Sequence, residues 1–272
     1  MGDLSKCEME GVKCITELPE ECMSHILSLT SPRDAARSAV LSSEFRSAAN
    51  SDVVWGSFLP SGFEEIISKL ESPLVFSSKK DLYLHFCNGP FLLKDNTKSF
   101  WLDKATGKKC YMLGGRELSI SLENVTSYWR WMPQPSSRVP AVAKLMIDCS
   151  LKIKGKMKSR MLSPSTTYVG YLLFKVASPE EVCVRWGWNA GLGGYGGDFR
   201  RVHTSEQQQQ YEEEVPHMRK DGWLELEMGS FFNDKNEDDE LEMEMRNFHI
   251  RTPKSGLILE GVELRPTPTP TP

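Results

Sequence analysis

The spacing of hydrophobic positions changes near residue 99 and divides the chain into a helical part and a β-rich part. Before this point, apolar residues such as Met23, Ile26 and Leu27 recur at the period of one helix face. After it they alternate with polar residues, which is the pattern of a strand with one buried face. We therefore predict an α+β multidomain chain in which short helices precede an antiparallel β-sandwich of jelly-roll character.

Helix start signals are clear between residues 19 and 45. Pro19 suits the first position of a helix, where its missing N–H costs nothing, and acidic residues follow it. Ser31–Asp34 is a capping box with proline just inside it, and a third helix is expected to begin near Ser42 or Ser43. The apolar positions that the second and third helices would carry are Ala36, Val40, Leu41 and Phe45. A unit this small buries little apolar surface by itself and is expected to need a partner.

Two further helices are predicted within residues 61–97, which we interpret as a helical connector that packs the first domain against the second. Residues 62–71 place apolar side chains at helical spacing, and Ser78–Asp81 is another capping box. Asn88–Pro90 should end the second of these helices, because glycine and proline interrupt helical hydrogen bonding.

The β-rich part contains several runs of strand character. In residues 144–154 apolar and polar positions alternate, so one half-buried strand is expected there. Residues 168–176 are apolar on both faces, as in a central strand. The remaining strands are predicted at residues 182–188, 223–228, 240–246 and 256–264. In the third of these, Leu241, Met243 and Met245 should point inward and the glutamates between them outward.

The composition is that of an ordinary globular protein of 272 residues, with 39% hydrophobic residues and a formal net charge of −4. This charge does not favour nucleic-acid binding, which usually requires a basic domain. No apolar run is long enough for a membrane span, and residues 1–14, read as a flexible leader, lack a signal-peptide core. The expected location is therefore the cytoplasm, the nucleus or both. Residues 267–272 form a Pro/Thr tail that should be extended.

Seven cysteines are scattered along the chain without a CxxC pair. In a reducing compartment they are expected to be buried thiols rather than disulfides. Zinc is disfavoured, because Cys22 and His25 have no second close pair of ligands. We therefore expect neither a metal nor another cofactor.

One ordered set of residues within positions 15–60 goes beyond ordinary helix signals. It comprises Leu18-Pro19-x-Glu21, Ile26-Leu27, Ser31-Pro32-Arg33-Asp34, Val40, Phe45 and the closing Val54-Trp55. Together these residues resemble an F-box, and the resemblance implies docking onto the Skp-type adaptor of a cullin-RING ubiquitin ligase. The residues expected to contact the adaptor are Leu18, Pro19, Ile26, Leu27, Pro32, Val40 and Trp55. The alternative is an ordinary helical cap on a larger domain.

A second ordered set covers residues 98–266. Its segments are Ser99–Met112, Arg116–Ile120, Tyr128–Trp131, Asp221–Glu225 and Lys254–Ile258. Together they resemble the phloem-lectin family of plant proteins, similar to the jasmonate-induced tobacco agglutinin. The resemblance implies a lectin domain that binds N-acetylglucosamine oligomers or the core of N-glycans, and hence a chito-oligosaccharide or a glycoprotein as ligand.

Trp129 and Trp131 are the candidate carbohydrate-binding residues. They lie two positions apart, so in a strand both rings point the same way and can stack on the C–H face of a sugar. Packing in the sandwich core is the alternative use of such tryptophans. The resemblance favours sugar binding for Trp129, which occupies a tryptophan position associated with it in the family. The family's other sugar-contacting tryptophan is replaced here by Leu122, so the domain could instead bind a protein surface.

Three other features have weaker functional interpretations. Gly191–Gly196 matches GxGxxG but lacks the strand–helix context of a dinucleotide site, so a loop is expected. Residues 152–160 carry a lysine or arginine at every second position, which predicts a solvated strand face or a site for an anionic partner. Residues 236–240 form an acidic run and should be a charged loop.

No nucleophile elbow, metalloprotease motif or acid–base pair is recognisable, so no catalytic activity is expected. The two parts together indicate a substrate-recognition subunit of an SCF-type ubiquitin ligase. Its helices would hold the Skp-type adaptor, and through it the cullin scaffold, while the lectin domain holds the substrate. Transfer of ubiquitin would then be accelerated by proximity. A stand-alone lectin without a ligase role is the alternative, and a hydrolase has no motif in its favour.

Overall fold

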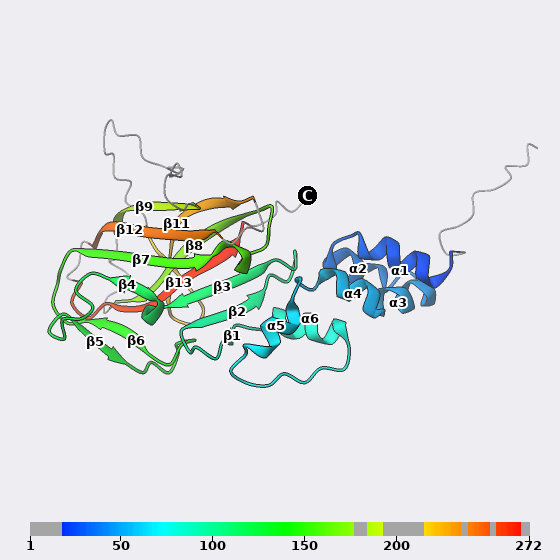
Figure 1. Cartoon of the computed structure of the whole chain (residues 1–272), viewed down its shortest axis with the longest axis horizontal. Coiled ribbons are helices and arrows are strands. Elements are labelled where there is room, and N and C mark those ends of the chain that lie inside the picture. The colour runs from blue at the N-terminus through cyan, green and yellow to red at the C-terminus, as the bar shows by residue number, and fades with distance from the viewer. Residues whose placement is uncertain (1–17, 177–183, 193–214, 235–238, 251–253, 268–272) are drawn as a thin grey trace, which may run out of the picture. The chain divides into compact units, whose positions relative to one another are not determined.

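The computed structural model describes residues 18–176, 184–192, 215–234, 239–250 and 254–267 (Figure 1). The predicted leader, most of the GxGxxG segment and the last residues of the Pro/Thr tail lie outside the described residues. The chain divides into two compact units. Of the described residues, the first unit comprises 18–59 together with 76–84 and 104–107, and the others form the second.

The first unit is built mainly from four short helices. They are α1 (Glu20–Ser28), α2 (Pro32–Ser38), α3 (Ser43–Asn50) and α4 (Asp52–Phe58). The predicted starts are confirmed, because the Ser31 Oγ accepts a hydrogen bond from the Asp34 N–H at 3.1 Å and the Ser42 Oγ caps α3. Pro19 lies one position earlier than predicted, at the N-cap of α1.

The prediction for the apolar face of α2 was wrong. The helix ends at Ser38, and residues 39–41 form the turn that leads to the Ser42 cap of α3. Val40 and Leu41 therefore lie outside the helix and are exposed, and Ala36 also faces outward. The buried face is formed instead by Pro32, Ala35 and Ser38.

The core of the first unit centres on Trp55, which is almost fully buried. Its Nε1 donates to the carbonyl oxygen of Ala49 at 2.6 Å. Its ring lies 5.8 Å from that of Phe58 and 5.2 Å from that of Tyr83, between ring centroids. Tyr83 comes from α6 (Lys79–Cys87), so residues downstream of the F-box-like stretch complete its core.

The predicted helices of residues 61–97 are both present, as α5 (Phe63–Ser68) and α6. Ser78 caps α6 by accepting a hydrogen bond from the Asp81 N–H at 3.1 Å, as the capping box predicted. The helix ends before Gly89 and Pro90.

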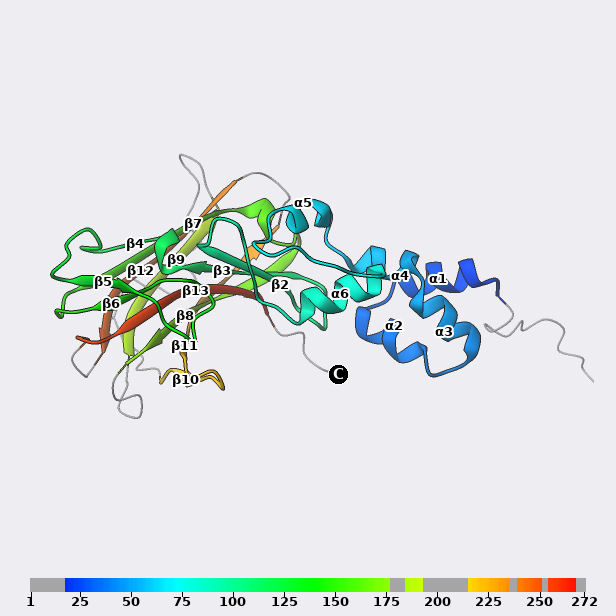
Figure 2. The same ribbon diagram turned by 90° about the horizontal axis from the view of Figure 1, so that it is seen from below.

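Two antiparallel sheets form most of the second unit (Figures 1 and 2). The first sheet contains β1 (Phe91–Leu92), β2 (Lys98–Leu102), β3 (Lys109–Gly114), β13 (Ile258–Pro266), β8 (Thr166–Lys175), β11 (Leu224–Asn233) and β10 (His217–Met218), in this order, with β6 (Val142–Leu145) joined to β13 and β5 (Trp129–Met132) to β6. The second sheet has the order β4 (Leu118–Ile120), β7 (Leu151–Lys158), β12 (Glu240–Ile250) and β9 (Val184–Leu192). Two short 3₁₀ turns, Gly115–Glu117 and Ser159–Met161, follow β3 and β7.

The inner faces of the two sheets form the sandwich core. Leu241, Met243 and Met245 of β12 are buried, as the alternation predicted. β8 lies between β11 and β13, which confirms the central strand. A Cβ added at Gly155 of the second sheet would lie 3.4 Å from the side chain of Leu113 of the first, so the sheets are in close contact there.

The single strand predicted over residues 144–154 is wrong. The chain forms β6 in the first sheet and β7 in the second, and residues 146–150 cross between them. The alternation continues through the crossing, but Ile147 is exposed rather than buried. The Lys254 side chain fixes the crossing, since its Nζ donates to the Cys149 carbonyl oxygen at 2.6 Å and pairs with Asp148 at 3.0 Å.

Candidate binding surfaces

The first unit exposes several large apolar side chains, although its own core is complete. We call this set the helical apolar surface. Its members are those in the first four helices and their connections, with the exposed fractions Ile26 (41%), Leu29 (76%), Val40 (80%), Leu41 (67%) and Val53 (63%). Where exposed apolar groups adjoin one another on a protein surface, they mark a surface that a partner covers.

The structure divides the residues predicted to bind the adaptor into two groups. Pro19, Ile26 and Val40 are exposed, and Leu18 is half-buried. Leu27, Pro32 and Trp55 are buried within the unit, where they hold its helices together. Sequence reasoning did not single out Leu29 and Val53, because neither belongs to the residues that carry the resemblance.

The two candidate tryptophans lie on the same face of β5, opposite Leu145 and Ala143 of β6. Trp129 is only 3% exposed, and its Nε1 donates to the Ser121 carbonyl oxygen at 2.9 Å. Trp131 is half-buried, with the Arg116 guanidinium 3.8 Å from its ring centroid. One ring is thus enclosed, and a cation covers one face of the other.

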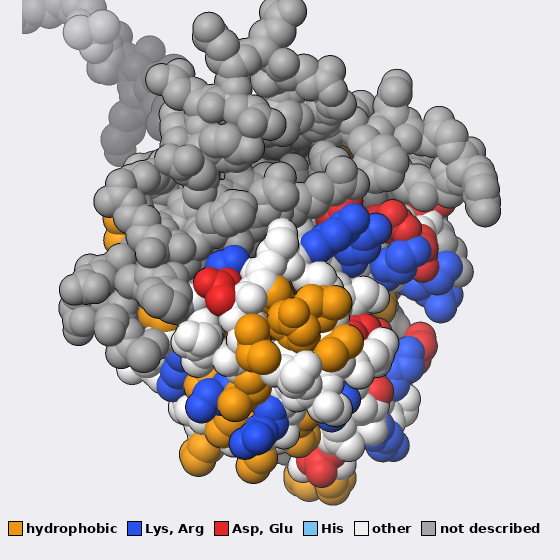
Figure 3. All heavy atoms as spheres, turned by 90° about the vertical axis from the view of Figure 1, so that its left-hand side faces the viewer, with side chains coloured by type: hydrophobic (Ala, Val, Ile, Leu, Met, Phe, Trp, Pro, Cys, Tyr) orange, Lys and Arg blue, Asp and Glu red, His pale blue; other side chains and the backbone are white. Residues whose placement is uncertain are grey.

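Leu122 occupies the position of the missing tryptophan and is 45% exposed. Val125 and Ile147 are also exposed in the β4–β5 and β6–β7 connections. Figure 3 shows hydrophobic side chains gathered at this end of the sandwich, with basic side chains beside them. The end of the domain therefore carries aliphatic groups where an aromatic platform would be needed for a sugar.

Leu122 has a φ of 61°, in the left-handed region that glycine adopts without strain. We expect Leu122→Gly to keep or raise the free energy of unfolding, by up to about 1 kcal/mol, because it removes this strain. Val125→Gly is the matched control from the same loop and should destabilise the domain by about 0.5–1 kcal/mol. Urea denaturation measures both variants, and equal losses would contradict the expectation.

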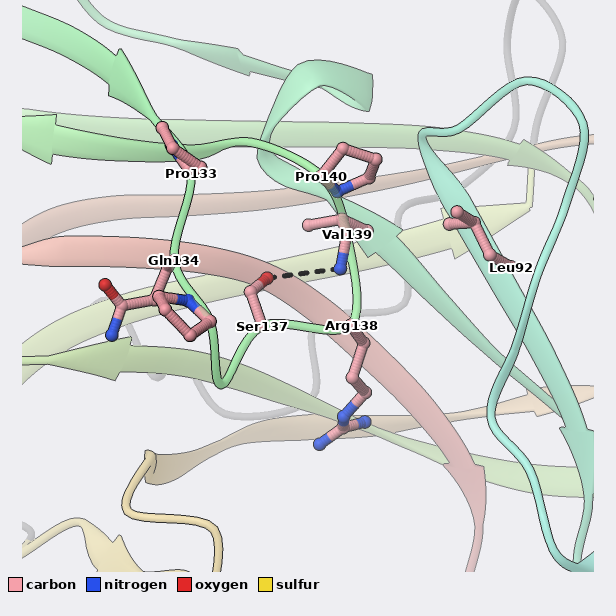
Figure 4. Close-up of a pocket in the computed structure, with 8 residues that line it drawn as sticks. Leu92, Pro133, Gln134, Ser137, Arg138, Val139 and Pro140 are labelled. Atoms are coloured by element: carbon pink, nitrogen blue, oxygen red, sulfur yellow. Dashed lines mark hydrogen bonds between the residues drawn. The ribbon is translucent and has the colours of Figure 1, made fainter.

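A shallow pocket of about 480 Å³ lies beneath the β5–β6 connection, residues 133–140 (Figure 4). Its lining is largely apolar and rich in proline. The lining residues are Leu92, Pro133, Gln134, Pro135, Ser137, Arg138, Val139 and Pro140. The connection is held by Trp223, whose Nε1 donates to the Ser136 carbonyl oxygen at 2.9 Å. A ligand here would contact mainly apolar side chains, with the polar groups of Gln134, Ser137 and Arg138 beside them.

Glu260 anchors the same connection from β13. Its Oε1 accepts hydrogen bonds from the Arg138 N–H at 2.7 Å and from the Ser137 hydroxyl at 3.1 Å. The side chain is buried, and its Oε2 has no hydrogen-bond partner among the described residues. Burial raises the pKa of Glu260, and the hydrogen bond from the Arg138 N–H opposes this in part.

Glutamine at position 260 should make stability less dependent on pH. The pKa of Glu260 is higher in the folded state than in the unfolded state, so the protonated carboxyl favours folding. This contribution to the free energy of unfolding is fully present below the pKa of the unfolded state and is lost as the pH rises through the pKa of the folded state. Glu260→Gln should therefore gain stability relative to the wild type between about pH 4 and about pH 7. Urea denaturation at both pH values tests this, and a difference independent of pH would contradict it.

A buried ionic cluster lies beside the β5–β6 connection, on the first sheet. The Glu263 carboxylate accepts hydrogen bonds from Arg138 at 2.5 Å and from Arg219 at 3.1 Å, and Arg265 pairs with it at 3.3 Å. Its side chain is only 2% exposed. Arg219 and Arg265 also pair with Glu225, at 2.8 and 2.7 Å. The cluster links residues more than 120 positions apart and fixes the connection to β13.

The basic stripe follows β7, and its lysines are exposed, as the alternation predicted. Lys152 and Lys154 pair with Glu244 of β12 at 2.7 and 3.3 Å. Lys156 pairs with Glu240 at 2.8 Å and with Glu242 at 2.5 Å. We call this arrangement the Lys–Glu ladder. Because the glutamates neutralise it, the stripe is a solvated face rather than a site for an anionic partner.

The most perturbed nucleophilic groups are buried in the fold. Burial raises the pKa of the Cys110 thiol and of the Tyr111 phenol, which is opposite to the activation of a nucleophile. Cys22 is exposed on α1, so the expectation of a buried thiol is wrong for it. Over the described ranges, no group of three His, Cys, Asp or Glu side chains is arranged to hold a metal ion. None of the described helices has the length and apolar character needed to cross a membrane.

Comparisons with known proteins match the two parts of the chain separately. The F-box-like family model matches residues 15–60, and the Phloem protein 2 model matches residues 108–266. Among solved structures, a family 35 carbohydrate binding module from Clostridium thermocellum covers 57% of this chain and 96% of its own, with 8% identity and a TM-score of 0.34. A likeness this weak says nothing about what this chain binds.

Whole-chain relatives come from Arabidopsis thaliana. F-box protein At2g02240 is 41% identical, covering 94% of this chain and 82% of its own. F-box protein PP2-B10 is also 41% identical, over 91% of this chain and 92% of its own. F-box protein SKIP3 is 37% identical, over 93% and 88%. With both family models matched in order, the chain belongs to the plant family of F-box proteins that carry a phloem protein 2 domain.

Proposed function

We propose that the protein is a non-catalytic substrate receptor of an SCF-type ubiquitin ligase in the cytoplasm or nucleus. The first unit binds a Skp-type adaptor, which connects the receptor to the cullin scaffold. The phloem protein 2 domain binds the substrate. Ubiquitin transfer is then accelerated because the substrate is held near the charged conjugating enzyme.

The helical apolar surface is the observation that carries this proposal. Five large aliphatic side chains on α1 or at its C-terminal end, on α4 and in the turn between α2 and α3 are exposed, which supports a surface that a partner covers. Leu18, Pro19, Ile26 and Val40 are accessible enough to contact the adaptor directly. Leu27, Pro32 and Trp55 support the surface from within the unit, and their substitution would act through folding.

Co-purification of the full chain with a recombinant Skp-type adaptor tests the ligase assignment. We expect a stable complex from the wild type and none from the double variant Leu18→Ala with Pro19→Ala. A wild-type chain with folded helices that binds no Skp-family adaptor would overturn the assignment. A stand-alone lectin would then be the remaining reading.

For the substrate side, we propose that the domain binds a glycoprotein or chito-oligosaccharide at Trp131, with Trp129 as a buried support. A glycan array tests this with the wild type and Trp131→Ala, since the half-buried ring can be removed without opening the core. We expect Trp131→Ala to lose binding. Equal binding by both proteins, or none by the wild type, would exclude this platform and favour a protein surface as the ligand.

A further inference from the structure

Three basic residues lie in one row across the first sheet. The register places Arg130 of β5 opposite Lys144 of β6, and Lys144 opposite Ile258 of β13. Ile258 in turn lies opposite Lys175 of β8. Residues directly opposite one another point to the same face, so the three cations share it. We call Arg130, Lys144 and Lys175 the basic row, which spans roughly 14 Å at about 4.8 Å per strand.

The basic row has no carboxylate partner among the residues that the structure describes. Lys175 donates to the Ser136 hydroxyl at 2.8 Å and lies 4.7 Å from the Trp223 ring centroid. Arg130 and Lys144 face each other as like charges, an arrangement that destabilises a sheet. This is the reverse of the Lys–Glu ladder on β7, where each paired lysine meets a glutamate.

The row lies on the same face as the pocket beneath residues 133–140. Met132 and Val142, two positions along from Arg130 and Lys144, pack with the cluster that contains Val139 of that connection. Lys175 contacts the connection directly through Ser136. Unpaired positive charge and an apolar, proline-lined hollow of about 480 Å³ are thus neighbours on one surface.

We propose that this face binds an acidic, extended peptide segment of a partner protein, with its carboxylates on the basic row and an apolar side chain in the pocket. This rests on the proposed receptor function and names the class of substrate feature recognised. The positive charge of the basic row favours an acidic partner. The pocket favours a peptide, because a peptide carries apolar side chains that can fill it. Nucleic acid is disfavoured, because the net charge is −4 and three cations form a small footprint.

The experiment uses fluorescence anisotropy on the full chain at low ionic strength. The probe is a labelled peptide of six glutamates and one leucine, compared with a peptide of six glutamines and one leucine. We expect only the glutamate peptide to bind. Arg130→Gln with Lys144→Gln should weaken binding by roughly tenfold, because two charge contacts are lost. The matched control, Lys152→Gln with Lys154→Gln, removes the same charge from the Lys–Glu ladder and should change binding by less than about twofold.

Stability provides an independent readout of the same variants. Removing the repulsion with Arg130→Gln alone should raise Tm by about 1–3 °C while weakening the peptide complex. Replacing leucine by serine in the peptide should also weaken binding, because the pocket loses its apolar group. A substitution that raises Tm but weakens peptide binding indicates that the residue serves a partner rather than the stability of the fold.

Several results would overturn the proposal. The first is equal binding of the glutamate and glutamine peptides. The second is an equal loss of peptide affinity in the basic-row variant and the control variant. The third is unchanged affinity when serine replaces the leucine of the peptide. Capture of the Skp-type adaptor is measured on the same preparations. If the wild type captures the adaptor but does not bind the glutamate peptide, this inference alone is contradicted, whereas failed adaptor capture by the wild type contradicts the proposed function.

Discussion

The double substitution Val40→Asp with Leu41→Asp should abolish capture of a recombinant Skp-type adaptor while the first unit stays folded. Val40 and Leu41 lie in the turn before α3 and are among the most exposed members of the helical apolar surface. Because their side chains are exposed, they contribute little to the stability of the free chain, and the substitution should change its free energy of unfolding only slightly. In a complex they would bury two unpaired carboxylates, and we expect the Kd to rise at least roughly 100-fold.

Two controls separate loss of the surface from loss of the fold. Ala36→Asp places one such carboxylate on the exposed side of α2 and should leave adaptor binding within about twofold of the wild type. Trp55→Ala should unfold the unit, because a buried ring and its hydrogen bond to Ala49 are lost, at about 3–5 kcal/mol. Calorimetry and far-UV circular dichroism are the measurements. Unchanged affinity in the double aspartate variant would mean that the adaptor binds elsewhere.

Glu263→Ala should be the most destabilising single substitution in the second unit, lowering its free energy of unfolding by about 3–5 kcal/mol. The carboxylate is buried and shared by Arg138, Arg219 and Arg265. Its removal leaves the three guanidinium groups, within the described part of the chain, with only Glu225 and Asp221 as ion-pair partners, so the positive charge in this poorly solvated site is no longer balanced. Chemical denaturation, followed by the fluorescence of the tryptophans, measures the loss.

Glu227→Ala is the matched control for this prediction. Glu227 carries the same carboxylate, lies opposite Tyr171 on the neighbouring pair of strands and is exposed. Its removal should change stability by no more than about 0.5 kcal/mol. If the two variants lose equal stability, the ionic cluster contributes nothing beyond an ordinary surface carboxylate.

Local features of the fold were predictable because their causes lie within a few residues. The caps at Ser31, Ser42 and Ser78 each join a side chain to a backbone N–H three positions on. The inward positions of β12 follow from strict alternation of methionine or leucine with glutamate. Such signals need no knowledge of the rest of the chain.

Features that depend on distant partners were missed. The alternation over residues 144–154 continues through a crossing between two sheets, and only the long-range pairing of β6 and β7 reveals the break. The Glu263 cluster joins β13 to a connection 125 positions earlier. Sequence spacing cannot show that an arginine and a glutamate so far apart will be buried together.

The candidate sugar site shows the same limit at one residue. The pattern correctly places Trp129 and Trp131 on one strand face, but the exposure of each ring depends on what covers it. The Ser121 carbonyl oxygen binds the first ring, and the Arg116 guanidinium covers the second. Both contacts come from outside β5, so the choice between core packing and sugar stacking was not readable from spacing alone.

The lysines of β7 also have a consequence for association between molecules. On one side of this eight-residue strand β4 pairs with residues 153–155, and residues 156 and 157 pair there with no strand among those the structure describes, so this part of the border can offer backbone groups to a second chain. Charged side chains at every second position make pairing of such borders unfavourable, since a second chain would remove water from lysines that remain about half exposed in the Lys–Glu ladder. Neutralising these lysines, as acetylation does, would therefore favour aggregation through this strand even where the folded monomer is barely less stable.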